Sequence, residues 1–389
     1  MNRHKEISLL AASSMTVMAG ATISPALPEI GVFFAHEPNA DFWVKLMLTL
    51  PALFIALGAP VVGWLVDRWQ RKPVLLGAVF LYGAAGASGL YAPTLNTLLL
   101  GRVGLGLAVA GIMTCTTTLV GDYFVGAERN RFLGLQAAAM SFGGVVFTLF
   151  GGFLADVGWR APFAIYLLAF VILPLLWFAL DEPKRELKVD EGTKAGLPFG
   201  LLALLYPLMF VCQVIFYLIP VQLPFHLKGL LNKGGALSGL AMALFNLCAV
   251  IAALSYRSWK EKVSYQTVFV ILFALISVGY LCLAQAATYW QVLGSMVIAG
   301  AGFGLLMPNT SIWLLARTPE ELRGRAVGGL TMCLFFGQFL SPFAAAWRTP
   351  SQTMSGVYAV GGVISLVFAF CFGVAVWRSG TTPEFKEQQ

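Results

Sequence analysis

The composition of the chain excludes a soluble globular protein. Of its 389 residues, 58% are apolar and only 11% are charged, and the mean hydropathy is +0.80; in soluble domains about a quarter of the residues are charged. The net charge of +7 does not indicate nucleic-acid binding, because the basic residues fall in short clusters between apolar runs.

Apolar runs long enough to cross a bilayer, which takes roughly 20 helical residues, recur along the whole chain. Their interruptions are mostly Ser, Thr, Asn and Gln, which a membrane helix tolerates. The sequence therefore predicts an all-α integral membrane protein. The twelve expected spans lie near residues 7–28, 43–66, 73–92, 95–120, 131–155, 160–180, 198–225, 235–256, 264–286, 289–315, 326–347 and 353–377.

The distribution of Lys and Arg predicts the orientation of these spans, because basic residues favour cytoplasmic loops. With the N-terminus inside, most of the 25 basic residues fall in segments expected on the cytoplasmic side. Both termini are therefore expected in the cytoplasm. The basic start followed by an apolar run is similar to a signal peptide, but its removal would break this alternation, so we interpret it as an uncleaved first helix.

A polar stretch from Asp181 to Lys194 separates six spans from six. It predicts an N-terminal bundle (1–180), a cytoplasmic linker (181–197) and a C-terminal bundle (198–389). An offset of 194 residues places Gly106 on Gly300 and Gly143 on Gly337, and a nearby offset places the Pro25–Pro28 motif on Pro220–Pro224. This repeat predicts two pseudo-symmetric six-helix bundles, an architecture common among secondary transporters.

The segment Gly63-Trp-Leu-Val-Asp67-Arg68-Trp-Gln70-Arg71-Lys72 resembles the loop signature G-x-L-x-D-R-x-G-R-K of the major facilitator superfamily, with Gln70 in place of the second glycine. Arg102 and Gly106 match its R-x-x-x-G motif. The chain is most similar to the drug/proton antiporter group, whose motif at the end of the first span resembles Pro25-Ala-Leu-Pro28-Glu29. In span five the chain departs from the antiporter signature, because Phe147-Thr148 stands where the signature has its central Gly-Pro.

The resemblance implies the major facilitator fold and a gate at the cytoplasmic surface. In that gate Asp67 faces the start of span eleven, Arg71 reaches Asp122, and Asp122 and Arg129 resemble the acid and base that close the fourth-to-fifth loop. A carboxylate at a helix N-terminus is stabilised by the helix dipole. A static clamp of the loop is the alternative role. The gating candidates are Gly63, Asp67, Arg68, Arg71, Lys72, Asp122 and Arg129.

Three residues are candidates for proton coupling: Glu29, Arg102 and Asp122. An unpaired guanidinium at bilayer depth is costly, so Arg102 either faces a cavity, where it senses protons or an anionic substrate, or bonds to backbone carbonyls of adjacent helices. Glu29 is either a proton carrier or a solvated residue beyond a helix that ends at Pro25 and Pro28.

The superfamily cavity is lined by spans one, four, seven and ten, so the resemblance implies a neutral hydrogen-bonding and aromatic pocket. Polar side chains that only join helices are the alternative. The cavity candidates are Arg102, Thr114, Thr117, Gln213, Phe216, Tyr217, Asn246, Asn309, Trp313 and Gln338.

Together these features predict a secondary active transporter that works by alternating access, in proton-coupled efflux of a small neutral or anionic drug-like compound or metabolite. The spans around the expected cavity carry no Asp or Glu in their interiors, which disfavours lipophilic cations. Uptake or release of a polar metabolite, such as an organic acid or siderophore, is the alternative. A non-transporting receptor or scaffold is a second alternative.

The expected setting is the inner (cytoplasmic) membrane, which a multi-pass monomer would cross, with a small molecule, protons and lipid as partners and no nucleic acid. The scattered Cys and His residues predict no metal site. No enzyme or ATP-binding motif occurs, so neither an enzyme nor a cofactor is expected.

Overall fold

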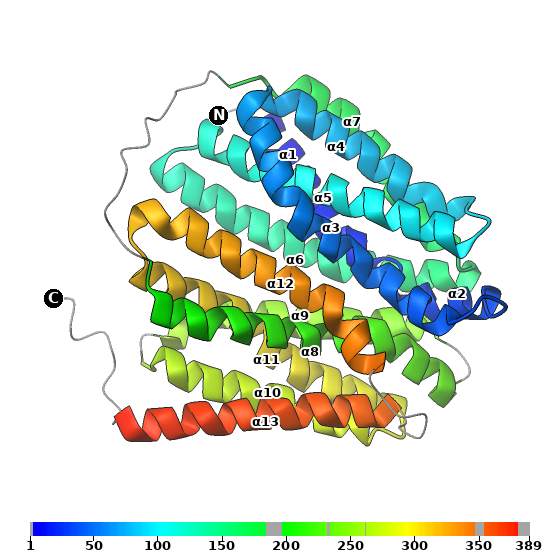
Figure 1. Cartoon of the computed structure of the whole chain (residues 1–389), viewed down its shortest axis with the longest axis vertical. Helices are drawn as coiled ribbons and strands as arrows, with labels where there is room; N and C mark the ends of the chain where they lie inside the picture. Colours follow the sequence, from blue (N-terminus) through cyan, green and yellow to red (C-terminus); the bar gives the residue numbers. More distant parts are fainter. Residues whose placement is uncertain (1–2, 184–196, 232–233, 261, 347–353, 380–389) are drawn as a thin grey trace.

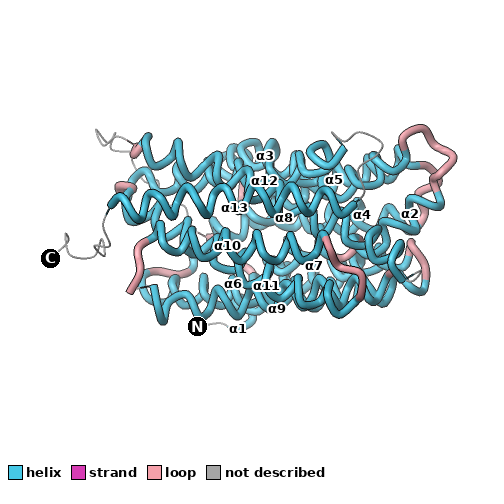
Figure 2. Tube along the Cα trace, turned by 90° about the horizontal axis from the view of Figure 1, so that it is seen from below, coloured by secondary structure: helices cyan, strands magenta, loops and turns pink. Residues whose placement is uncertain are grey.

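The computed structural model describes residues 3–183, 197–231, 234–260, 262–346 and 354–379, and all regular structure within them is helical (Figures 1 and 2). The elements of the first half are α1 (Arg3–Ala21), η1 (Ser24–Ala26), α2 (Leu27–Phe33), α3 (Ala40–Arg68), α4 (Arg71–Gly86), η2 (Ala87–Leu90), α5 (Leu95–Tyr123), α6 (Gly126–Val157), η3 (Ala161–Leu167) and α7 (Leu168–Ala179). Those of the second half are α8 (Phe199–Leu231), α9 (Gly235–Lys260), α10 (Tyr265–Ala284), α11 (Tyr289–Arg317), η4 (Glu320–Leu322), α12 (Arg323–Ala346) and α13 (Met354–Ser379).

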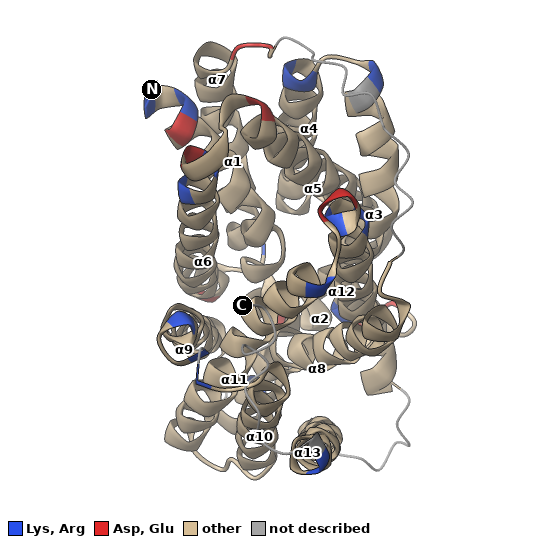
Figure 3. Ribbon diagram, turned by 90° about the vertical axis from the view of Figure 1, so that its left-hand side faces the viewer, with Lys and Arg blue, Asp and Glu red and all other residues tan. Residues whose placement is uncertain are grey.

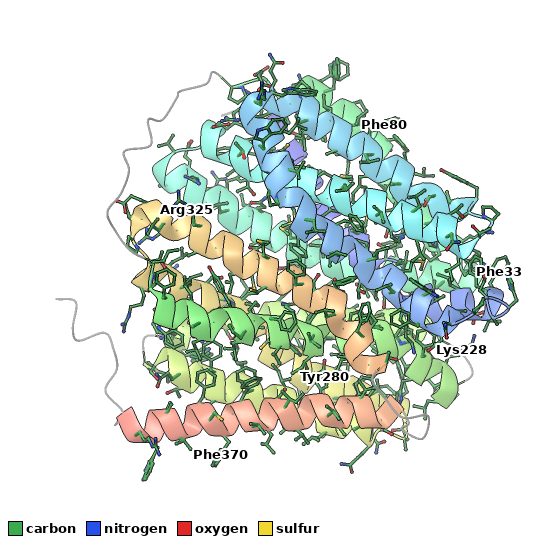
Figure 4. All side chains as sticks on the ribbon, viewed as in Figure 1. Phe33, Phe80, Lys228, Tyr280, Arg325 and Phe370 are labelled. Atoms are coloured by element: carbon green, nitrogen blue, oxygen red, sulfur yellow. The ribbon has the colours of Figure 1, made fainter. Side chains whose placement is uncertain are left out.

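Among the described residues, 12 helical segments are long and apolar enough to cross a membrane, which confirms the predicted spans and the all-α membrane class. Their outward side chains are apolar: Phe80 and Phe370 are 57% and 70% exposed and point away from the bundles (Figure 4). Such surface is stable only against lipid. The chain is a multi-pass membrane protein.

The start of α1 and the end of α13 lie at the same end of the helices (Figure 1), which we call the terminal end. The opposite end, where α2 lies, is called the far end. Viewed from the terminal end, charged residues gather at the helix ends and loops, whereas the helix bodies are almost free of charge (Figure 3). This distribution is expected for helices that begin and end at the membrane–water interface.

The buried apolar residues form two clusters that follow the two halves of the sequence. One contains residues from Leu9 to Leu180 together with Val221, and the other contains residues from Leu202 to Phe372. Each cluster contains a buried tyrosine that bonds to the first helix of its own half: Tyr82 donates to the Met15 carbonyl and Tyr280 to the Ile215 carbonyl, both at 2.6 Å. The proposed linker lies mostly outside the described residues.

The repeat offset of 194 residues recurs in the geometry of α5 and α11, whose first and last residues match at that offset. Both helices begin with a threonine N-cap in a capping box, Thr94 in α5 and Thr288 in α11. Gly106 of α5 and Gly300 of α11 face a backbone carbonyl of the neighbouring helix so closely that an added Cβ would clash. The pseudo-symmetric duplication is therefore confirmed in these helices.

The first span differs from the expectation that Pro25 and Pro28 end its helix. The helix breaks after Ala21, passes through η1, and continues as α2 to Phe33. Proline is tolerated in the first turn of a helix, where its missing N–H has no intrahelical partner in any case. Glu29 consequently lies in the first turn of α2 and not beyond the helix.

Candidate transport pathway and gates

The loop between α3 and α4 lies at the terminal end. Arg71, the first residue of α4, forms an ion pair with Asp122 at the end of α5. A carboxylate is unfavourable at a helix C-terminus, and the Arg71 guanidinium compensates it. Asp122 therefore pairs with Arg71 and not with Arg129, which is exposed on α6. The side chain of Asp67 lies outside what the structure describes.

Two other basic residues of the signature, exposed Arg68 and partly buried Lys72, contact aromatic rings. Arg68 and Lys72 lie over the rings of Trp64 and Trp177, at 5.6 and 5.7 Å from the ring centroids. Gly63 has open space where a side chain would project. These residues hold the loop against aromatic side chains.

Glu182 is a residue of this site that the sequence analysis did not single out. Its carboxylate accepts hydrogen bonds from the backbone N–H groups of Arg71 and Lys72, at 2.7 and 2.9 Å. The third residue of α4 is Pro73, which has no N–H, so Glu182 satisfies both donors at this helix start. The sequence contains two signals for this contact, Pro73 near the start of the third span and an acidic residue after the sixth span. It does not show that the two lie close together in space.

The neighbouring Asp181 joins the start of α1 to the end of α7. Its carboxylate pairs with Lys5 at 2.7 Å, and its carbonyl accepts a hydrogen bond from the Tyr123 hydroxyl. The hydrogen bond and positive charge of Lys5 lower the pKa of Asp181, and Lys72 adds to the effect. The carboxylate therefore stays ionised at neutral pH, and Asp181 links the end of α7 to α1 and α5 at the protein surface.

Arg102 is completely buried inside the first bundle. Its guanidinium donates to the Tyr166 hydroxyl at 3.1 Å and to the Gly86 carbonyl at 3.4 Å, and it lies 4.8 Å from the centroid of the Phe163 ring. Tyr166 in turn donates to the Ala19 carbonyl near the break in the first span. Of the two arrangements expected for Arg102, the structure has the one in which it bonds within the bundle.

At the far end, two carboxylates of the first half contact the second half. Glu29 of α2 pairs with Lys228 of α8 at 2.7 Å, and Asp156 of α6 accepts a hydrogen bond from the N–H of Ala236, in the first turn of α9, at 3.1 Å. Lys228 lies at this end together with Phe33 (Figure 4). Both contacts exist only while the two bundles are close at the far end.

Small residues bring α6 and α9 into close contact at the same end. A Cβ added to Gly152 would lie 2.8 Å from the Gly235 carbonyl and from Gly239, so only glycine allows this approach. Of the outer glycines of the span-five signature, Gly152 thus packs across the bundle interface, whereas Gly151 packs against the Thr22 carbonyl of its own half. Thr148, which replaces the proline of that signature, donates its hydroxyl to the Gly144 carbonyl at 2.6 Å, and because threonine keeps the backbone N–H that proline lacks, α6 continues through this position to Val157.

The described hydrogen bonds, ion pairs and ring contacts between the two halves lie from the middle of the molecule to the far end. A further example is the ring pair of Phe42 in α3 and Phe343 in α12, 5.1 Å apart. The part of α6 nearest the terminal end is exposed from Gly126 to Ala138, apart from buried Phe132 and partly buried Gln136. The bundles are therefore closed together at the far end and more open at the terminal end.

At mid-height, several cavity candidates come together without any charge. Gln338 donates to Gln213 at 3.3 Å, and the Phe216 ring contacts those of Phe245 and Phe303, at centroid distances of 5.6 and 5.2 Å. Tyr217 points its hydroxyl at Gly20 of α1, across the bundle interface. Partly exposed Thr114, exposed Thr117 and partly exposed Asn246 lie on α5 and α9.

Asn309 and Trp313 do not lie on this wall. Asn309 is completely buried, accepts a hydrogen bond from Tyr256 at 2.9 Å and donates to the Tyr265 carbonyl at 3.1 Å. Trp313 is 6% exposed and stacks on Tyr265. Their spacing puts both on the face of α11 that packs into the second bundle, so the expectation that they line the cavity is corrected.

A sequence profile of the Major Facilitator Superfamily matches residues 9–241 and 205–389. The chain belongs to the major facilitator superfamily. It is therefore a transporter and not an enzyme, as the sequence predicted. Its similarity to the drug/proton antiporter group is also confirmed, because full-length relatives bear efflux and resistance names.

Two such relatives illustrate the similarity. The chain is 25% identical to the class C tetracycline resistance protein of Escherichia coli, over 97% of this chain and 98% of the relative. It is 23% identical to the bacillibactin exporter of Bacillus subtilis (strain 168), over 96% and 97%.

Solved structures of superfamily transporters share the fold. An inward-facing, unoccupied bacterial homologue of the human lysosomal transporter Spinster superposes with a TM-score of 0.75 at 18% identity, covering 98% of this chain and 99% of that one. The inward open xylose transporter of E. coli gives 0.76 at 16% identity, covering 98% and 97%.

Proposed function

We propose that this transporter exports a small neutral or anionic organic compound across the cytoplasmic membrane in exchange for protons, as a monomer with both termini in the cytoplasm. The observation that carries the proposal is that relatives matching nearly the whole chain are named for tetracycline resistance and multidrug efflux. With this orientation the terminal end faces the cytoplasm, and the arrangement described above is the inward-facing state.

The preference for neutral or anionic compounds rests on the charges around the proposed pathway. The described mid-height side chains are amides, hydroxyls and aromatic rings, and α8, α9, α11 and α12 contain no Asp or Glu. A cation that leaves water without a counter-charge suffers a large desolvation penalty. Neutral compounds meet hydrogen-bond partners in Gln213, Gln338 and Tyr217 without that penalty.

Alternating access would proceed by separation of the far end and closure of the terminal end, between bundles that span 1–180 and 198–389 around the linker 181–197. The signature residues Gly63, Asp67, Arg68, Arg71, Lys72, Asp122 and Arg129 form the proposed cytoplasmic gate. The Arg71–Asp122 pair supports the proposal because it fixes the loop that must meet the second bundle. Of the three candidates for proton coupling, Arg102 is enclosed by the first bundle. The two carboxylates, Glu29 and Asp122, therefore remain the candidate proton carriers.

The test is transport by purified protein in liposomes. Tetracycline is loaded as a probe, a pH gradient is imposed, and efflux is compared with counterflow of the same probe without a gradient. Proton-driven movement together with counterflow supports the proposal. Absence of both, for every neutral, anionic and cationic probe tried, would contradict transport and leave the receptor or scaffold alternative.

A second candidate is release of a siderophore, and it is favoured by one observation, the similarity to a relative named bacillibactin exporter. A siderophore is polar and carries many hydrogen-bonding groups, which suits an amide-lined and hydroxyl-lined wall. Bacillibactin in the same counterflow assay separates the two candidates: counterflow of bacillibactin without tetracycline would favour siderophore release, and counterflow of tetracycline without bacillibactin would favour the first proposal.

A further inference from the structure

The break in the first span lies where the two bundles meet at the far end. All three residues of η1 are buried, and η1 contacts α6 of its own half and both α8 and α9 of the other. Ser24, its first residue, is completely buried and donates its hydroxyl to the Pro220 carbonyl of α8. Its oxygen also lies 3.4 Å from the sulfur of Met242 in α9.

The Pro220 carbonyl needs a donor because of a proline one turn further along α8. In a regular helix this carbonyl would accept from the N–H of residue 224. Residue 224 is a proline, which has no N–H. In a membrane segment an unsatisfied carbonyl is strongly unfavourable, so it recruits a neighbouring hydroxyl or water.

The two partners of this bond belong to equivalent copies of the internal repeat. Ser24 directly precedes the Pro25–Pro28 motif, and the acceptor is the first proline of the Pro220–Pro224 motif, its counterpart at nearly the repeat offset. The residue before Pro220 is Ile219, whose side chain has no hydrogen-bond donor. The bond therefore runs in one direction only, from the first half to the second.

We propose that Ser24 is a positioning residue that latches the far end of the transporter shut, by satisfying the carbonyl that Pro224 leaves without an intrahelical donor. The latch involves no ionisable group, so it is independent of the Glu29–Lys228 pair and of protonation. When the bundles part at the far end, the carbonyl exchanges Ser24 for water. The inference rests on the alternating access proposed above but not on the substrate.

The experiment measures the ratio of far-end-open to far-end-closed molecules without substrate. Spin labels are placed at Val32 and Trp290, which are 63% and 79% exposed on α2 and α11, in a background free of the native cysteines. Ser24→Ala should raise the ratio of open to closed molecules roughly three- to eighteen-fold, the range given by measured hydrogen bonds in membrane proteins. Ser365→Ala is the matched control, because Ser365 is completely buried but bonds within α13.

The double variant separates a latch from a packing defect. Pro224→Ala supplies the missing N–H to the Pro220 carbonyl, so it should raise the open fraction by itself. Ser24→Ala should then add little to Pro224→Ala, because both changes remove the same bond. Additive shifts, or a Ser24→Ala distance distribution equal to that of Ser365→Ala, would overturn the proposal.

Amide hydrogen exchange on the chain with its native cysteines gives a second measurement. Ser24→Ala should speed exchange in η1, in α2 and at the far end of α8, and Ser365→Ala should not. Because neither measurement uses a substrate, failure of the latch and failure of the efflux assignment are distinguishable.

Discussion

Replacement of Arg102 by glutamine tests whether this residue serves the first bundle or the substrate. In the structure it makes two hydrogen bonds, to Tyr166 and Gly86, and lies over two aromatic rings, Phe163 and Tyr166. No carboxylate bonds to it among the described residues. Arg102→Gln should therefore destabilise the bundle and leave the charge preference of the substrate site unchanged.

The magnitude follows from opposing contributions. Hydrogen bonds from a charged donor contribute about 1.5–3 kcal/mol each, and cation–π contacts add about 0.5–2 kcal/mol. Removing a guanidinium from bilayer depth regains about 2.5–3.5 kcal/mol. Near the middle of these ranges the lost contacts contribute about 6 kcal/mol and the relief about 3 kcal/mol, and glutamine can restore one bond of about 1 kcal/mol, so we expect Arg102→Gln to lower the free energy of unfolding by about 2–3 kcal/mol.

The assay is reversible unfolding in mixed micelles, with two tyrosine variants as a matched pair. Tyr82→Phe removes one hydroxyl that bonds to an α1 carbonyl, and Tyr166→Phe removes a similar bond together with the contact to Arg102. Tyr166→Phe should therefore cost more than Tyr82→Phe. A fully stable Arg102→Gln that selectively loses binding of anionic ligands would refute this reasoning and place Arg102 at the substrate.

Three further changes test the gates. Arg71→Ala should leave the protein inserted and folded but impair transport at least tenfold in the liposome assay. The reason is that Asp122 loses its ion-pair partner and the signature loop is no longer fixed in position. Full transport by this variant would refute a gating role. Glu29→Gln should weaken far-end closure by less than about 1 kcal/mol, since the side chains of Lys228 and Glu29 are 32% and 52% exposed; if proton-driven transport and counterflow both persist, Asp122 is the remaining candidate carrier. Loss of proton-driven transport with intact counterflow would instead make Glu29 the proton carrier. Because Lys5 lowers the pKa of Asp181, this pair stabilises the protein above the ordinary carboxyl pKa and loses its effect only as the pH falls through the lowered value. Asp181→Asn should therefore leave the pH profile of transport unchanged between about pH 5 and 8, and a shifted profile would contradict this assignment.

The span count, the membrane class and the internal repeat could be read from the sequence because each depends on local composition. Apolar runs must cross the bilayer wherever they occur, and the match of α5 to α11 at the repeat offset reflects a duplicated local pattern. The signature loop could also be recognised locally, because its residues are consecutive. The pairing of Arg71 with Asp122 was inferred only through the family resemblance.

Side-chain partners that are far apart in the sequence were decided by the tertiary structure. The sequence left Arg102 two environments, and only the packing of η3 against η2, α4 and α6 brings Tyr166 and Phe163 to its guanidinium. Asn309 and Trp313 were assigned to the cavity because of their helix, but the rotation of α11 buries them in the second bundle. The roles of Glu182 and Ser24 could not be predicted from the sequence, since their hydrogen-bond partners are 111 and 196 residues away along the chain.

Hydropathy and repetition thus determined which segments cross the membrane and that the two halves are alike, because burial in lipid acts on each segment by itself. The gates required the three-dimensional arrangement. A hydrogen bond or an ion pair forms only between groups brought within about 3–3.5 Å, and that distance is set by how the membrane-spanning segments pack together. The sequence alone shows that Pro224 lacks an N–H. Only the packing of the helices brings the Ser24 hydroxyl to the Pro220 carbonyl that this leaves without an intrahelical donor.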